Sequence, residues 1–424
     1  MFAVDRASRS ITNLATILKA ACCWIAFSPL LLIPRRRDWV IVIGREDGKF
    51  LDNAKYFFLS ATVILKPHVR VAFVTEREDV VNLLANTDYE VVRFPTRSSI
   101  WLLLRAGTVI VDSVDWTRHG RSYFLLGAKL IQLWHGIGYK RIELDLWRHI
   151  AQKSKRPGCT LRFWGHLVTA FVTGRLPIYD AFISPSTFYR DKVFKKAFLS
   201  RHSLVCGYPR NIFERIPVNI HDAVHLNVDP VISSKIQNWI PDNKRMVLIT
   251  PTFRDSGSSA ISLDPETSAA IDAWCNENKV EMVFKLHPFD KNAGCIQGRH
   301  LHLCDPNSDL YPLMSMSNAL ITDHSSIYMD YLHLDKPVLF LIIEGNCDLD
   351  NERQFQFDPE RMTPGAKASS WPSLLKQLEI ELMHDTYRDA RTKLKCVAFD
   401  DISQESSVET IIDFMRRERW IPDT

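Results

Sequence analysis

The sequence lacks several features that would assign it to a narrow class of protein. Its nine cysteines form no C-x-x-C pair and no regular framework, which argues against a zinc site and favours a reduced protein that faces the cytosol. No repeat or low-complexity segment is present, so a fibre, a repeat array and extensive disorder are excluded. The remaining composition, 46% hydrophobic and 24% charged over 424 residues, is that of an ordinary globular chain, long enough for two Rossmann-sized domains.

The positive charge is mild overall but uneven along the chain. The formal net charge is +4, and we expect no nucleic-acid partner. Between Lys140 and Arg175, eight lysines and arginines stand against two acidic residues, interleaved with Trp147, Phe163 and Trp164. Such a strip suits an anionic surface or substrate. A solvated loop and helix face would have the same composition.

The N-terminal segment carries a membrane signal. Apolar side chains recur at helical spacing in its first part, at Ile11, Leu14, Ala15, Leu18, Cys22 and Ile25. The apolar run from Ala20 to Ile33 has 14 residues and is interrupted only by Ser28 and Pro29 before the basic triplet at 35–37. A bilayer span needs roughly 20 residues, and no cleavage site of a secretory signal is evident.

We therefore expect residues 1–37 to form a helix that lies in the membrane interface, with basic residues at anionic headgroups. Two alternatives stay open, namely a span from Leu14 to Ile33 with Lys19 snorkelling and a buried soluble helix. Cys22 and Cys23 fit either acylation or packing.

Apolar runs alternate with helical segments in two series, which predicts parallel sheets covered by helices. The first series comprises Trp39 to Gly44, Val69 to Thr75, Glu90 to Phe94, Thr108 to Ser113, Lys129 to Trp134, Tyr179 to Ser184 and Ser203 to Cys206. The second comprises Met246 to Thr250, Glu281 to Leu286, His300 to Cys304, Ala319 to Thr322 and Pro337 to Ile343. A less patterned, proline-containing stretch from Ile216 to Lys244 separates them.

This pattern predicts an α/β protein with two Rossmann-like, doubly wound domains that face each other across a cleft. We expect the first domain over 38–215 and the second over 216–400. A C-terminal helix within 401–424 could pack back on the first domain. In open α/β sheets ligands bind beyond the carboxyl ends of the strands, so the residues that follow each run are the candidates for chemistry.

The most informative strand end is the one after Ala319 to Thr322. There Asp323, His324, Ser325 and Ser326 precede an amphipathic segment, which places the serines at a helix N-terminus. Unpaired N–H groups, the helix dipole and serine hydroxyls together favour an anion such as phosphate. Asp323 could orient these groups or contact a ribose. Alternatively, Asp323 or Ser325 only caps the helix.

Two strand ends in the first series also carry candidate residues. His135 and Gly136 follow Lys129 to Trp134, and His135 is a candidate base, although an isolated histidine is often structural. Gly136 and Gly138 would let a ligand approach the backbone. Arg210 lies in a turn after Ser203 to Cys206, where it could meet a phosphate or form a surface charge.

In the second series, cations and hydroxyls follow neighbouring strands. Thr252 and Arg254 come after Met246 to Thr250, whereas Lys285 and His287 stand at the end of Glu281 to Leu286. Together with the paired serines these groups have the inventory of a diphosphate site.

Seven segments, taken together and in order, resemble the CDP-glycerol glycerophosphotransferase family, which includes teichoic-acid and capsule polymer synthases and primases. They are DNAKYFF (52–58), QLWHGIGYKRIELD (132–145), ISPSTFYRDKVFKKAF (183–198), CGYPRN (206–211), TPTFRD (250–255), KLHP (285–288) and ITDHSSIYMDYLHLDKP (321–337). The likeness covers roughly Gly44 to Ile343.

The resemblance implies a GT-B-like fold, peripheral (monotopic) attachment at the cytoplasmic face of the membrane and a CDP-polyol donor. It further implies transfer of a polyol phosphate to a polyprenyl-linked glycan or polyol-phosphate acceptor, and it leaves a homo-oligomer open. The two histidines important in the family fall on His135 and His287, and its donor-binding hydroxyls fall on Thr252, Ser325 and Ser326. Two departures stand out. The family often has H-G-x-P-x-K where this chain has Gly138 before Tyr139 and Lys140, and it often has Tyr at His324.

Our hypothesis is an in-line phosphoryl transfer in which His135 takes the proton of the acceptor hydroxyl and CMP leaves. We expect Arg254, His287, Ser325 and Ser326 to bind the diphosphate, with Thr252, Lys285, Asp323 and His324 beside them and Gly136, Lys140 and Arg210 on the acceptor side or in secondary roles. The sequence has no D-x-D-type acidic cluster at the cleft, so we expect no required metal or other cofactor. The alternatives are a GT-B glycosyltransferase that uses a nucleotide sugar and a non-catalytic membrane scaffold.

Overall fold

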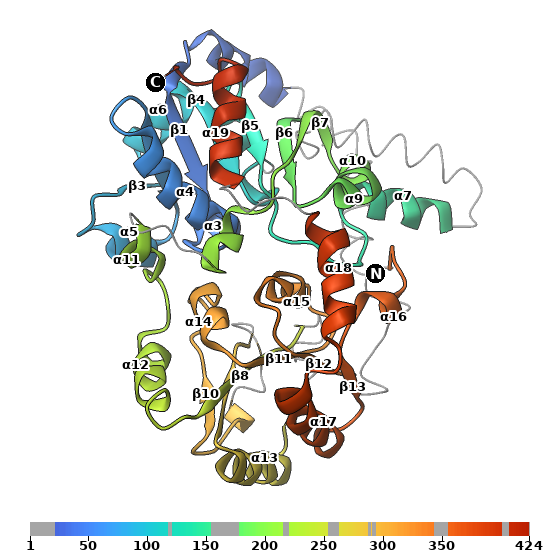
Figure 1. Cartoon of the computed structure of the whole chain (residues 1–424). Coiled ribbons are helices and arrows are strands. Elements are labelled where there is room, and N and C mark those ends of the chain that lie inside the picture. The colour runs from blue at the N-terminus through green and yellow to red at the C-terminus, as the bar shows by residue number, and fades with distance from the viewer. Residues whose placement is uncertain are drawn as a thin grey trace.

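The structure is a computed structural model that describes residues 22–117, 121–153, 178–214, 220–252, 263–286, 290, 294–342, 355–400 and 407–423. It contains two parallel β-sheets, each flanked by helices, one above the other in the view of Figure 1. This confirms the predicted α/β class with two parallel sheets.

The first sheet has seven strands in the order β3-β2-β1-β4-β5-β6-β7. They are β1 (Arg36–Ile43), β2 (Arg70–Thr75), β3 (Glu90–Arg93), β4 (Ala106–Val111), β5 (Lys129–Gln132), β6 (Ile178–Ser184) and β7 (Leu199–Val205). The central strands are apolar runs buried on both faces, as in β4, where all six residues are buried. Val40 of β1 pairs with Val71 of β2 on one side and with Thr108 of β4 on the other, so the strand order reverses between β1 and β4.

Helices precede, connect and follow these strands. They are η1 (Ser28–Leu32), α3 (Arg45–Gly48), α4 (Asp52–Leu65), α5 (Glu78–Leu84), α6 (Arg97–Arg105), η2 (Asp115–Thr117), η3 (Arg121–Leu125), α7 (Glu143–Lys153), α9 (Thr187–Tyr189), η4 (Arg190–Phe194), α10 (Lys195–Ala197) and η5 (Pro209–Glu214). Helix α6 begins at a capping box, in which Thr96 and Ser99 each bond the other's backbone N–H.

The second sheet repeats the same winding over six strands in the order β10-β9-β8-β11-β12-β13. They are β8 (Arg245–Thr250), β9 (Val280–Phe284), β10 (Leu301–Leu303), β11 (Ala319–Thr322), β12 (Val338–Leu341) and β13 (Ala366–Ala368). The order reverses between β8 and β11. Strand β13 was not predicted, because its three residues, AKA, contain no apolar run.

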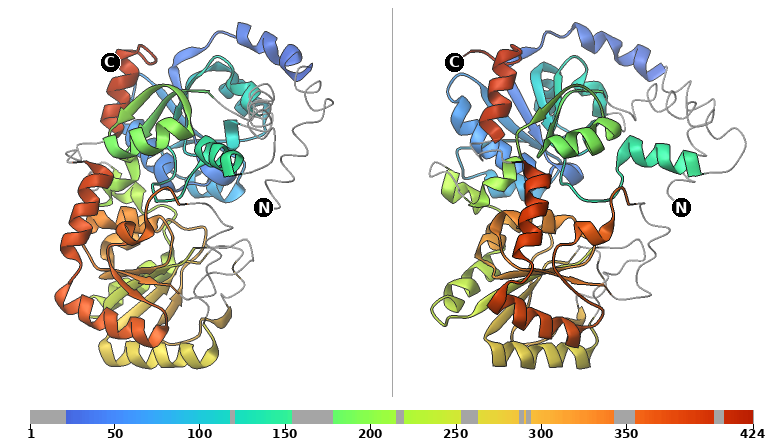
Figure 2. Two further views of the ribbon diagram at one scale, coloured as in Figure 1. Left: turned by 90° about the vertical axis from the view of Figure 1, so that its right-hand side faces the viewer. Right: turned by 45° about the vertical axis from the view of Figure 1, so that its right-hand side comes forward.

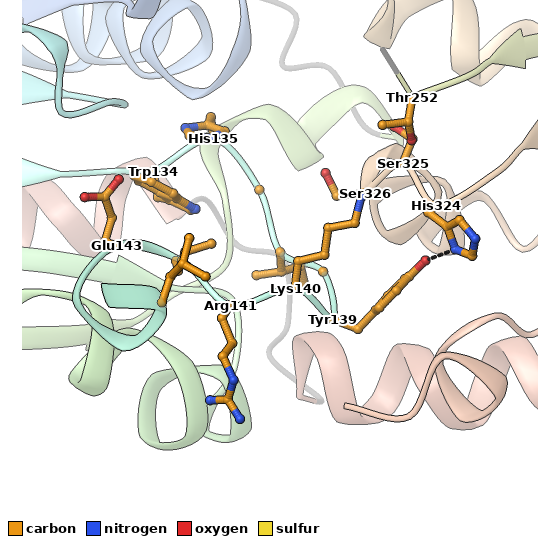
Figure 3. Close-up of a pocket in the computed structure, with 15 residues that line it drawn as sticks. Trp134, His135, Tyr139, Lys140, Arg141, Glu143, Thr252, His324, Ser325 and Ser326 are labelled. Carbon is orange, nitrogen blue, oxygen red and sulfur yellow. Dashed lines mark hydrogen bonds between the residues drawn. The ribbon is translucent and has the colours of Figure 1, made fainter. Parts of the chain in front are cut away.

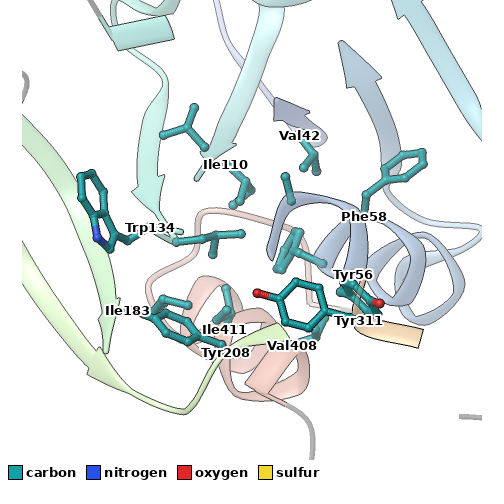
Figure 4. Close-up of a cluster of buried hydrophobic side chains, with 14 of the residues drawn as sticks. Val42, Tyr56, Phe58, Ile110, Trp134, Ile183, Tyr208, Tyr311, Val408 and Ile411 are labelled. Carbon is teal, nitrogen blue, oxygen red and sulfur yellow. The ribbon is translucent and has the colours of Figure 1, made fainter. Parts of the chain in front are cut away.

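The helices of the second half are α11 (His221–Val224), α12 (Pro230–Trp239), α13 (Pro265–Asn278), α14 (Tyr311–Met316), α15 (Ile327–Tyr331), η8 (Leu332–Leu334), α16 (Pro359–Met362), α17 (Trp371–His384) and α18 (Arg388–Phe399). Helix α18 leads from the second sheet back toward the first, as both views in Figure 2 show. Helix α19 (Ser407–Arg417) then packs beside α4. Its Val408 and Ile411 share a buried cluster with Val42 of β1 and Tyr56 of α4 (Figure 4).

The N-terminal segment differs from the expectation of a membrane helix over 1–37. Residues 1–21 lie outside the described part, and β1 already begins at Arg36. Phe27 stacks on Tyr123 at 4.6 Å between ring centroids. The Arg35 guanidinium donates to backbone carbonyls, among them Ala106 O at 3.3 Å, so this arginine does not meet headgroups as predicted. No helix in the described part of the chain is long and apolar enough to cross a membrane.

A buried carboxylate stabilises the outer strands of the second sheet. Glu281 of β9 accepts a hydrogen bond from Lys244 Nζ at 2.8 Å, and ring nitrogens of His300 and His302 lie 3.1 and 2.7 Å from its oxygens. Burial alone would raise the pKa of Glu281, but hydrogen bonds from His302, Lys244 and His300 lower it to about 2.

Replacement of Glu281 with glutamine should lower the free energy of unfolding by about 3 kcal/mol at pH 7, because Lys244, His300 and His302 lose the carboxylate charge that they contact. Because folding lowers the pKa of Glu281, its ionised carboxylate stabilises the folded protein at any pH above the ordinary pKa of 4.5. This contribution is lost as the pH falls from 4.5 toward 2. Urea unfolding at pH 7 and at pH 3 to 4 measures the difference. The exposed Glu277→Gln is the matched control. An E281Q penalty that did not shrink with falling pH would contradict the assignment.

Candidate functional site

The two points where strand order reverses carry the loops that border the site. In doubly wound sheets such switch points open a crevice beyond the carboxyl ends of the strands, where ligands bind. In the first sheet these loops follow β1 and β4, and in the second they follow β8 and β11. The loop after β5, which contains His135, lies beside them.

Two hollows open between the loops of the two sheets. The smaller, about 360 Å³, is lined by residues of the loop 134–146 on one side and by Thr252, His324, Ser325 and Ser326 on the other (Figure 3). The larger, about 450 Å³, is lined by the loop after β1 and by the loops after β8 and β9, residues 306–311 and the start of α15. His135, Thr252, Ser325 and Ser326 line both hollows, so they mark the place where the hollows meet.

His135 is held as a neutral imidazole. Its Nδ1 lies 3.2 Å from the backbone oxygen of Asp112, and because a carbonyl only accepts, this contact places the proton on Nδ1 and leaves Nε2 as the basic atom. Burial, followed by the positive charge of Arg45, lowers the pKa of His135 to about 4. At physiological pH this half-buried histidine beside the two hollows is therefore neutral, with Nε2 unprotonated, as a general base must be.

The backbone around His135 requires glycine. Gly136 has φ +147°, and a Cβ there would lie 3.2 Å from Arg210 Nη2 and 3.7 Å from Ser326 Oγ. A Cβ at Gly138 would lie 3.4 Å from that of Ser326. The loop after β5 therefore reaches the start of α15 closely because it carries no side chains at these positions.

Asp323 and Thr252 form one unit at the switch point of the second sheet. The buried Asp323 carboxylate accepts hydrogen bonds from Thr252 N at 2.8 Å and Thr252 Oγ1 at 2.6 Å. These hydrogen bonds of Asp323 therefore go to Thr252, whereas we expected Asp323 to orient the groups at Ser325 and Ser326 or to contact a ribose.

The serines precede α15. Ser326 is its N-terminal flanking residue, but no side chain caps the helix. Ser325 is half-buried and Ser326 is exposed, and both line the two hollows. Their hydroxyls make no hydrogen bond with any residue that the structure describes, so they are available to a bound group.

His324 contacts the first half of the chain. Its Nδ1 lies 2.5 Å from the hydroxyl of the buried Tyr139 (Figure 3). Lys140 lines the smaller hollow and forms a β-bridge with Phe355, whose ring packs on Tyr139 at 5.1 Å. The loop after β5 thus joins the second half at two places.

The other predicted cations differ in position. Lys285 lines the larger hollow, but its Nζ donates to Ser308 O at 2.7 Å, to Ser308 Oγ at 3.0 Å and to Asp305 O. Burial lowers the pKa of Lys285. Arg254 and His287 lie outside the described residues, so their expected roles remain predictions.

For Arg210 the sequence left a phosphate contact or a surface charge open, and the surface position is wrong. Its guanidinium is 1% exposed and donates to Asp330 at 2.8 and 3.1 Å, to Asp52, and to the backbone oxygen of His135 at 2.9 Å. Asp52 begins α4 on the first sheet and Asp330 lies in α15 on the second. Arg210 therefore joins the two halves and holds the backbone of His135.

Sequence reasoning did not single out Arg45, Asp52, Asp112, Tyr139 and Asp330 as site residues. Three of them lie within segments that carry the family resemblance, Asp52 in 52–58, Tyr139 in 132–145 and Asp330 in 321–337, whereas Arg45 and Asp112 lie in none. Among the described residues, no three His, Cys, Asp or Glu side chains gather as metal ligands would.

A family model described as CDP-Glycerol:Poly(glycerophosphate) glycerophosphotransferase matches residues 25–414. A teichoic acid poly(glycerol phosphate) polymerase of Bacillus spizizenii is 26% identical over 376 residues, which cover 85% of this chain and 87% of the relative. A polymerase of the same description from Bacillus subtilis is 27% identical over 244 residues, 55% of this chain and 30% of the relative.

The fold has solved counterparts. The structure of the wall teichoic acid polymerase TagF matches with a TM-score of 0.67 at 19% identity and covers 91% of this chain and 89% of that one. A UDP-GlcNAc 2-epimerase from Neisseria meningitidis matches with a TM-score of 0.50 at 13% identity over 89% of this chain and 99% of the other. At these identities the likeness shows the fold.

Replacement of Arg210 with methionine should lower the free energy of unfolding by about 3 to 5 kcal/mol, because Asp52 and Asp330 are left buried without their cation. Urea unfolding measures the loss. The matched control is Arg77→Met, which breaks a partly exposed pair with Asp79 and should cost at most about 1 kcal/mol. Equal losses in the two variants would show that the buried pairs do not stabilise the protein.

Proposed function

The chain belongs to the CDP-glycerol:poly(glycerophosphate) glycerophosphotransferase family, and on that premise we propose that it transfers a polyol phosphate, in the first place glycerol phosphate, from a CDP-activated donor to a hydroxyl of a lipid-linked acceptor in the synthesis of a cell-surface polymer. The observation that carries the proposal is the meeting of His135 with Thr252, Ser325 and Ser326 where the two hollows join.

The donor occupies the larger hollow. This hollow lies at the switch point of the second sheet and combines hydroxyl donors with the cationic side chains of Arg45, Lys49 and Lys285. A hollow lined by both neutral hydrogen-bond donors and cationic side chains suits a diphosphate group. The acceptor occupies the smaller hollow, whose lining includes Tyr139, Lys140 and the first turn of α7.

The reaction is an in-line displacement at phosphorus. Nε2 of His135 takes the proton of the acceptor hydroxyl while its oxygen forms a bond to the glycerol-bearing phosphorus. The bond from that phosphorus to the bridging oxygen breaks, and CMP leaves with the electron pair. Ser325 and Ser326 donate hydrogen bonds to phosphate oxygens whose charge changes along the reaction, while Asp323 fixes Thr252 beside them. Arg254 and His287 complete the diphosphate site in this proposal.

The protein works at the cytoplasmic face of the membrane as a peripheral protein. The segment before β1 contacts the first half of the protein through the ring of Phe27 and the guanidinium of Arg35. It also exposes three apolar side chains, Ile25 (74% exposed), Leu31 (56%) and Leu32 (84%). Exposed apolar side chains on a segment that packs against the protein favour insertion of these side chains into the headgroup region of a membrane.

Replacement of His135 with asparagine should lower turnover by about 10² to 10³-fold, because the general base is lost, and should leave CDP-glycerol binding nearly unchanged. The assay combines CDP-glycerol with a lipid-linked acceptor and detects CMP and the mass of the product. The exposed His68→Asn is the control. A nucleoside diphosphate with a glycosidic product would instead show a glycosyltransferase, and full activity of H135N would refute the assigned base.

The wild-type pH profile tests the same histidine. Since the pKa of His135 is about 4, the imidazole is neutral and basic above that value, and kcat/KM should stay level from about pH 8 to pH 5 and fall as the pH approaches 4. The measurement is the initial rate at low substrate across this range. A fall that begins near the ordinary pKa of 6.5 would contradict it.

Replacement of Leu31 and Leu32 with serine should weaken binding to anionic lipid vesicles by about tenfold, because two exposed leucines no longer enter the bilayer. Sedimentation with vesicles measures the binding. Val231→Ser, which changes an exposed residue of the second half, is the matched control. Unchanged binding of the double variant would show that another surface attaches the protein.

A further inference from the structure

The loop after β1 places an arginine at the switch point of the first sheet. Arg45 begins α3 directly after β1, and it lines the larger hollow together with Ser325 and Ser326. The serines come from the second sheet, so Arg45 borders the same space from the other half of the protein. Switch points are where doubly wound sheets bind ligands, and here both switch points face one hollow.

This loop is held in a strained backbone conformation. Glu46 and Asp47 have φ of 50° and 66°, Gly48 has φ of 90°, and Asp52 has φ of 62°. A Cβ at Gly48 would lie 2.7 Å from Thr75 Cα, so the turn packs tightly against β2. Left-handed non-glycine residues persist only where their surroundings fix them, and they concentrate at ligand sites.

Asp52 holds Arg45 in place. Nε of Arg45 lies 3.6 Å from Asp52 Oδ2, while the other oxygen of that carboxylate accepts from Arg210. The Arg45 side chain is 33% exposed, whereas that of Asp52 is 5% exposed. The guanidinium makes no hydrogen bond with any described residue, since at 3.6 Å its Nε is too far from Asp52 for one.

The other cations that line the larger hollow in the described chain are already engaged. Lys49 forms an ion pair with Glu46, and Lys285 donates to the loop at 305–308. Arg45 therefore combines a permanent charge with unused donors. A planar guanidinium with several N–H groups matches two oxygens of one phosphate.

We propose that Arg45 binds the phosphate under transfer, opposite Ser325 and Ser326, and stabilises the charge on its non-bridging oxygens during the displacement. The inference rests on the proposed function, because it identifies the bound group as the distal phosphate of a cytidine diphosphate. The displacement itself is unchanged: the acceptor oxygen bonds to this phosphorus, CMP leaves with the electron pair, and the hydroxyl proton goes to His135.

The position of Arg45 also links it to the base. Asp52 holds Arg45 through one oxygen and Arg210 through the other, and Arg210 donates to the backbone oxygen of His135 at 2.9 Å. One carboxylate thus sets the positions of the cation and of the histidine. The positive charge of Arg45 also helps to keep His135 neutral and ready to accept a proton.

The test compares Arg45→Gln and Arg45→Lys with wild type by equilibrium binding of CDP and of CMP, and by turnover of CDP-glycerol. For R45Q we expect CDP affinity to fall about tenfold with CMP affinity unchanged, since only CDP carries the distal phosphate, and kcat to fall about 10²-fold. Arg45→Lys should recover part of both losses. Arg77→Gln, outside the hollow, is the control, and unfolding midpoints confirm that each variant is folded.

Unchanged CDP affinity in R45Q, or equal losses for CDP and CMP, would overturn the proposal, as would a wild-type protein that binds neither nucleotide. A second outcome would refute only the proposed function. If R45Q loses CDP affinity and keeps CMP affinity as expected, but the wild-type protein forms no phosphodiester, Arg45 is still a phosphate-binding residue. The two failures are therefore distinguishable.

Discussion

The buried ion pairs of Arg210 with Asp52 and Asp330 determine how the two halves of this protein meet. Removing charges from water costs several kcal/mol per ion, and only well-formed hydrogen bonds offset that cost. Arg210 supplies two such bonds to Asp330 alone, at 2.8 and 3.1 Å. A second buried pair, Lys55 with Asp309 at 2.7 Å, also crosses from α4 to the second half. The facing positions of the two switch points thus depend on charge pairing as well as on apolar packing.

The same network sets the chemistry of the site. Arg210 holds the backbone of His135, and Asp52 holds Arg45, so the candidate base and the candidate phosphate ligand move only if the bridge between the halves moves. The neutral state of His135 has the same origin, because burial and the charge of Arg45 both oppose its protonation. Strained backbone at Asp52 and at Trp134, with φ of 62° and 57°, lies in the loops that carry these residues.

The sequence predicts features that depend on neighbouring residues and not those that depend on distant ones. Apolar runs locate the central strands because a strand buried on both faces must be apolar, and the strand ends then point to His135 and the serines. The partners of Arg210 lie 158 and 120 residues away and leave no periodic trace. Arg35 shows an error of another kind. The basic triplet at 35–37 predicted a contact with lipid headgroups, but the guanidinium of Arg35 donates to backbone carbonyls of the first half.

The two departures from the family pattern lie together in space. At Gly138, the first departure noted in the sequence, a Cβ would lie 3.4 Å from that of Ser326, so this residue lies directly against the start of α15. The next residue, Tyr139, reaches the other departure, His324, at 2.5 Å. The Tyr139 hydroxyl thus reaches the turn at His324 from the opposite half of the protein. Gly138 and His324 both line the smaller hollow, so both departures act on its wall.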